Sequence, residues 1–130
     1  MRRWTRGFPL LLTSLVALLI AFVPLFAHHG TAAFDTAGMV TVTGKITDFQ
    51  FVNPHAQVFF ECKNDKGEME QWQGELTAPN KLARAGWTKR TLKPGDAVTV
   101  TGNQVKSGAH TLWIRKMIGP DGTELQLFED

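Results

Sequence analysis

The sequence from residue 39 onward predicts an all-β fold: a small, OB-like Greek-key barrel of five to six strands with one short helix between strands 3 and 4. Three observations predict it. Apolar and polar residues alternate with the two-residue period of half-buried strands. Turn signals made of Gly, Pro, Asn and Asp separate these segments. One helical segment follows the third strand, as in an OB-fold, although another small barrel or a compact sandwich also satisfies this order.

The first strand is expected to be long and bent. Residues 40–46 alternate between apolar and polar side chains, and the apolar phase then shifts to Phe49 and Phe51. A β-bulge near Thr47 and Asp48 explains the shift. A long, bent strand suits an OB barrel, because the first strand of such a barrel takes part in both of its sheets.

Two strands joined by a hairpin come next. Asn53-Pro54 is a turn signal, and residues 64–67 form the hairpin loop. The inward positions of the two strands are expected to be Ala56, Val58, Phe60 and Cys62 on the second and Trp72, Gly74 and Leu76 on the third. Cys62 is the only cysteine and is expected to be an inert buried thiol.

Residues 79–85 can form the short helix, because proline suits its first turn and Gly86 its C-terminal cap. Leu82 and Trp87 would then contact the core, and Trp113 is likewise expected in core or groove packing. Turn signals separate the remaining strands, which are expected at residues 97–101, 111–118 and 123–128.

Residues 1–27 have the composition of a secretory signal peptide, with early arginines, an apolar run and Ala27 at a cleavage site. An uncleaved anchor is the alternative, because the run approaches the roughly 20 residues that span a bilayer. We expect cleavage and a periplasmic protein that meets the membrane only through its leader. The mature chain then has an arm at residues 28–38 and a barrel domain at 39–130.

Cleavage also changes the charge. The full chain has 14 Lys and Arg against 12 Asp and Glu, a net charge of +2, and three of the arginines lie in the leader. The mature chain therefore has 11 basic residues against 12 acidic ones, a net charge of −1. The basic character belongs to the leader, and we expect no nucleic-acid partner.

Cleavage after Ala27 makes His28 the N-terminal residue, so its α-amine and imidazole become available to one metal ion. Such nitrogen ligands suit Cu(II), which also leads the affinity order of divalent metals. A histidine at the third mature position would offer a different, amide-based copper site, but that position is Gly30. The sequence thus suggests a Cu(II) site that needs a second side chain.

The strand phases suggest that side chain. Inward-facing Phe60 and Trp72 are expected to pair across the hairpin, which sets Gln57 opposite Glu75. His55 then becomes a diagonal neighbour of Glu75 on the outer face, where the carboxylate would orient the imidazole or bind the metal itself. The preferred second ligand is therefore His55, and the further choices are His29 and then His110 in a loop.

A simpler interpretation needs no metal: the N-terminal histidines are a solvated chain end, and His55 fixes a turn by a hydrogen bond. The first-ranked function is then a non-enzymatic periplasmic binding or interaction domain for an unknown protein or small ligand, with a groove at Gln57 and Phe59. Copper binding is the second hypothesis. A copper-dependent oxidative enzyme using the same ligands is the third, because no substrate site accompanies the histidines.

Several short motifs also carry a resemblance. They are His28-His29-Gly30, Asn53-Pro54-His55-Ala56, Gly86-Trp87 and Leu92-Lys93-Pro94-Gly95-Asp96. With them the chain resembles a family of small exported bacterial proteins, the domain-of-unknown-function family 6152. The resemblance implies an exported β-barrel domain with no established biochemical activity.

Overall fold

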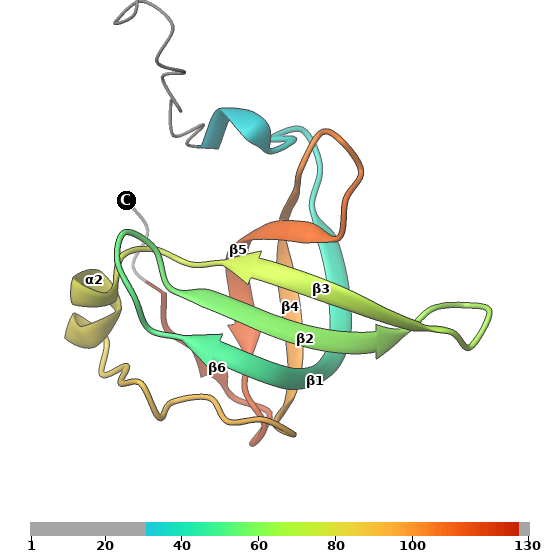
Figure 1. The fold of residues 1–130 in the computed structure, drawn as a ribbon. Coiled ribbons are helices and arrows are strands. Elements are labelled where there is room, and N and C mark those ends of the chain that lie inside the picture. Colours follow the sequence, from blue (N-terminus) through green and yellow to red (C-terminus); the bar gives the residue numbers. More distant parts are fainter. Residues whose placement is uncertain (1–30, 128–130) are drawn as a thin grey trace, which may run out of the picture.

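The structure is a computed structural model that describes residues 31–127 (Figure 1). The predicted leader and the histidines at 28 and 29 lie outside this range. The helix lies between the third and fourth strands, as predicted. In chain order the elements are η1 (Thr31–Ala33), β1 (Val40–Gln50), β2 (Gln57–Lys63), β3 (Met69–Glu75), α2 (Pro79–Arg84), β4 (Ala97–Gln104), β5 (Thr111–Ile118) and β6 (Glu124–Leu125).

The first five strands close into a barrel. They are hydrogen-bonded in the order β3-β2-β1-β4-β5, and a parallel pairing of β3 with β5 closes the ring. The long β1 pairs with β4 through its first half and with β2 through its second half, so it serves both sides of the barrel. The short β6 is added to β5 as an extra strand. This arrangement confirms the predicted OB-like barrel.

The predicted bulge in β1 is present. The register of β1 against β2 shifts between Ile46 and Asp48. Ile46, before the shift, is buried, and Phe49, after it, also packs against the core although it lies three positions later in the strand. The bulge therefore lets one strand present apolar side chains to the core in two phases.

The core consists of the side chains that the alternation places inside. Val58 and Phe60 of β2 are fully buried, and Trp72 of β3 stacks on Phe60 with ring centroids 6.4 Å apart. Leu82 of α2 joins the same cluster. Cys62 differs from expectation: it is only half-buried, because it lies near the end of β2, next to the hairpin loop.

Three boundaries differ clearly from the prediction. The fourth strand, expected at residues 97–101, continues to Gln104. The helix ends at Arg84, with Ala85 as its cap and Gly86 in the left-handed conformation at φ +88°. Of the expected strand 123–128, the last strand covers only Glu124–Leu125 among residues 123–127, and Phe128 lies outside the described range. Directly after this strand, the carbonyl of Gln126 accepts a hydrogen bond from the Trp87 indole (2.9 Å).

The arm is attached to the barrel at a few residues, of which Phe34 is buried while residues 35–38 are exposed. Phe34 forms a β-bridge with Val105 and is buried, and the N–H of Asp35 donates to the carbonyl of Gln104 (2.7 Å). The buried Asn103 amide donates to the carbonyls of Asp35 (3.0 Å) and Gly38 (2.9 Å). These contacts fix where the arm enters the domain.

Candidate functional site

His55 and Glu75 lie together on the outer face of the barrel, as the strand phases predict. The register pairs Phe60 with Trp72 and Gln57 with Glu75. His55 precedes β2, and its Nδ1 is hydrogen-bonded to Oε1 of Glu75, with both side chains about one-third exposed or less. A carboxylate oxygen accepts, so Nδ1 carries the proton. In the neutral imidazole the other ring nitrogen, Nε2, then has the lone pair that can bind a metal.

An aromatic series connects this histidine to the arm. The His55 ring meets Trp113 edge-on, with centroids 5.3 Å apart and an interplanar angle of 77°. Trp113 in turn contacts Phe34 of the arm, with centroids 5.9 Å apart. The parallel pairing of β3 with β5 sets Glu75 beside Trp113. The arm is thus attached to the same part of the surface that holds His55.

The two predicted groove residues lie on this outer face as well. Gln57 accepts a hydrogen bond from the amide of Gln73 (2.9 Å). Phe59 lines a hollow of about 320 Å³ beside the edge of β3. The other residues around that hollow are Gln71, Trp72, Gln73, His110 and Thr111.

His110 has different neighbours from His55. Its ring stacks on Trp72 with centroids 4.5 Å apart and an interplanar angle of 10°. Its Nε2 lies 3.8 Å from a carboxylate oxygen of Glu70. The structure therefore groups His110 with the Phe59 hollow rather than with Glu75.

Within residues 31–127, no three His, Cys, Asp or Glu side chains form a group that could hold a metal ion. His28 and His29, the other two ligands suggested by the sequence, fall outside that range. In the same part of the chain, no helix has the length and apolarity needed to cross a membrane.

Phe34 and Trp113 were not assigned to the site from the sequence. A signal existed for Trp113: it lies between Leu112 and Ile114, which both face the core, so alternation turns its large ring away from the barrel core. The ring is nevertheless only 8% exposed, because Phe34 and His55 pack against it. Phe34 is a large apolar residue in an otherwise small and polar arm. Only the tertiary structure joins the two rings.

The half-buried Cys62 thiol is expected to react slowly. Two effects raise the pKa of Cys62: burial is the larger, and the negative charge of Glu70 is the smaller. Because the thiolate is the nucleophile, a raised pKa lowers the reactive fraction at pH 8. Alkylation by iodoacetamide, followed by mass spectrometry, should be slower in the folded protein than in urea. Equal rates in the two conditions would contradict this assignment.

Comparison with solved structures finds partial similarity to TiaS, a tRNA agmatidine synthetase. The chain is 22% identical to apo TiaS with a TM-score of 0.43, covering 71% of this chain and 19% of that one. The chain is 23% identical to TiaS in its complex with tRNA and ATP, with a TM-score of 0.44, and the match covers 72% of this chain and 20% of that one. The chain thus spans about a fifth of these proteins. A search of curated proteins found no match.

A protein-family model matches most of the chain. The model of the Family of unknown function (DUF6152) matches residues 17–113. The matched range contains the His28-His29-Gly30 and Asn53-Pro54-His55-Ala56 motifs, on which the resemblance was based, together with four of the five barrel strands and the start of the fifth. The chain therefore belongs to the Family of unknown function (DUF6152).

Proposed function

We propose that the protein is an exported, non-enzymatic binding domain whose ligand surface is the outer face around His55. The leader composition supports export. The outer face supports binding, because it combines an oriented imidazole, a partly exposed carboxylate and the neighbouring Phe59 hollow.

Cu(II) is the ligand that one specific observation favours. The series Phe34–Trp113–His55 attaches the arm beside an imidazole whose Nδ1 is held by Glu75. The proposed ligands are the His28 amine and imidazole together with the imidazole of His55. Glu75 acts as a positioning residue, because its hydrogen bond at Nδ1 orients the ring.

The length of the arm constrains this ligand set. His28 lies six positions before Phe34, and three of the residues between them, Thr31–Ala33, form the short helix η1, which rises about 2 Å per residue. The ring centroids of Phe34 and His55 are each within 6 Å of the centroid of Trp113. The proposal therefore requires the three residues before η1, which span at most about 10 Å when extended, to turn back toward the imidazole of His55.

The test is a calorimetric Cu(II) titration of mature protein whose N-terminus has been confirmed by mass spectrometry. Glu75→Gln should lower copper affinity about 10- to 100-fold, the usual effect of losing the group that orients a metal-binding histidine. His55→Ala should lower it at least as much. His110→Ala is the matched control, since it removes a histidine from the neighbouring hollow, and it should leave copper affinity unchanged.

The outcomes separate the candidate functions. If His55→Ala binds copper as tightly as the unmodified protein, the copper proposal is wrong and the surface must serve another ligand. If copper binds as proposed, oxidation of ascorbate distinguishes a binding protein from an oxidative enzyme. A binding protein should turn over ascorbate no faster than the same concentration of free Cu(II).

A further inference from the structure

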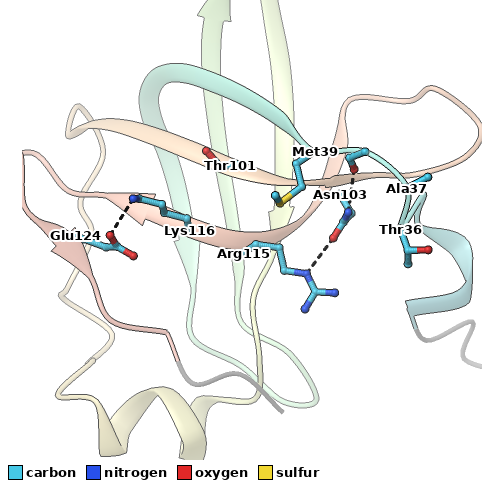
Figure 2. A pocket seen from close by; sticks show the side chains of 9 residues that line it. Thr36, Ala37, Met39, Thr101, Asn103, Arg115, Lys116 and Glu124 are labelled. Carbon is cyan, nitrogen blue, oxygen red and sulfur yellow. Dashed lines mark hydrogen bonds and ion pairs between the residues drawn. The ribbon is translucent and has the colours of Figure 1, made fainter.

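A second hollow, of about 620 Å³, lies on the other side of the arm, where β4, β5 and β6 approach it (Figure 2). It is separate from the surface around His55, and nothing above assigns it a role. The side chains that give it chemical character are Thr36, Met39, Asn103, Arg115, Lys116 and Glu124. Its volume is in the range of sites that bind small molecules.

One of the residues that line this hollow is an exposed arginine, Arg115, which is held by a buried amide. The Nε of Arg115 donates to Oδ1 of Asn103 (2.9 Å), and Asn103 is only 5% exposed. The Asn103 amide nitrogen is fixed in turn by the carbonyls of Asp35 and Gly38. Figure 2 shows this series of contacts running from the arm through Asn103 to the guanidinium. The guanidinium is therefore oriented before any ligand arrives.

The outer edge of the guanidinium is available. Among residues 31–127, its two Nη groups have no hydrogen-bond or ion-pair partner. The neighbouring Lys116 is already paired with Glu124, with its Nζ 3.0 Å from Oε2. The charged side chains that line the hollow thus sum to one positive charge, carried by Arg115. A guanidinium fork of this kind matches carboxylate or phosphate oxygens in a bidentate manner.

An apolar surface lies beside this charge. Met39 lines the same hollow and is 64% exposed, the most exposed of the large apolar side chains in the described part of the chain. Its flexible thioether adapts to ligands of different shape. The hollow thus offers one oriented cation and one apolar contact.

We propose that this hollow binds a small organic anion, with its oxyanion head on the Nη groups of Arg115 and its apolar body against Met39. Either a carboxylate or a phosphate monoester can supply the head, because the same fork recognises both. The proposal does not depend on copper or on His55.

The experiment is an NMR titration of the mature protein with hexanoate, hexyl phosphate, inorganic phosphate and neutral hexanol. Hexanoate or hexyl phosphate should shift the Arg115 Nε–H and Met39 methyl signals, and the tighter of the two identifies the head group. Hexanol should shift neither signal, and inorganic phosphate should bind more weakly than hexyl phosphate. Equal binding of the two phosphates would overturn the role of Met39, and no binding by either hexyl anion would overturn the site.

Arg115→Gln supplies the variant test. It should lower affinity for the tighter anion about tenfold or more, since hydrogen bonds to a charged group are lost. Arg115→Lys keeps the charge without the fork and should recover only part of the affinity. Arg90→Gln, at an exposed turn outside the hollow, is the matched control and should bind like the unmodified protein. An Arg115→Gln variant that binds equally well would contradict the proposal.

Discussion

Phe60→Ala is expected to destabilise the protein by about 3–5 kcal/mol, the usual cost of removing a fully buried phenylalanine. Phe60 is completely buried in the centre of the barrel and stacks on Trp72. The loss combines apolar burial with a cavity that the closed sheet can only partly collapse to fill. Urea unfolding followed by tryptophan fluorescence measures it.

The adjacent phenylalanine provides the control. Phe59 is only half-buried and faces the outer surface beside the hollow at the edge of β3. Phe59→Ala should therefore cost about 1 kcal/mol, typical of a point substitution outside the core. If Phe60→Ala does not fold, Phe60→Leu keeps most of the volume and should cost more than the matched Phe59→Leu, because only Phe60 is fully buried. Equal losses at both positions would mean that the faces of β2 are misassigned, because a register slip of one residue exchanges them.

Moving the α-amine away from His28 is expected to have the largest effect on copper binding. An extension of Gly-Ser-Ala before His28 separates the amine from the imidazole and removes the proposed chelate. Affinity should fall about 10²- to 10⁴-fold, the range by which two ligands tethered together exceed either alone. Calorimetric titration with Cu(II) measures this change.

The length of the extension matters for this test. A single added alanine would place His29 third in the chain, and an extension of two residues would place His28 there. A third-position histidine creates the amide-based copper site that the natural sequence avoids with Gly30. With an extension of three residues, neither His28 nor His29 is third in the chain. Undiminished affinity in that variant would show that the α-amine of His28 is not a ligand.

The sequence was most informative where structure depends on neighbouring residues. Alternation and the hairpin turn were sufficient to place Phe60 opposite Trp72, and so to bring His55 beside Glu75. The bulge after Ile46 followed from a change of apolar phase. These features are local, or they involve strands adjacent in the chain, and period and turn chemistry specify them.

Contacts between distant segments could not be predicted in this way. The packing of Phe34 on Trp113 joins a segment without periodicity to the fifth strand. The contact from Asn103 to Arg115 depends on how β4 and β5 pair around a register shift next to Gly102. A Cβ at Gly102 would come within 2.2 Å of the Trp113 carbonyl oxygen, so the close approach of these strands requires glycine there. Alternation within one strand carries no information about such a contact.

The proposed copper site requires the arm to bring the mature N-terminus to His55. This is tested by NMR of the mature protein, with isotope-labelled histidine and tryptophan, before and after addition of Cu(II), whose unpaired electron broadens the signals of nearby nuclei. We expect early loss of the His55 ring and Trp113 indole signals, while the His110 signals persist. If copper broadens only the N-terminal histidines and leaves His55 and Trp113 sharp, the proposed site is contradicted.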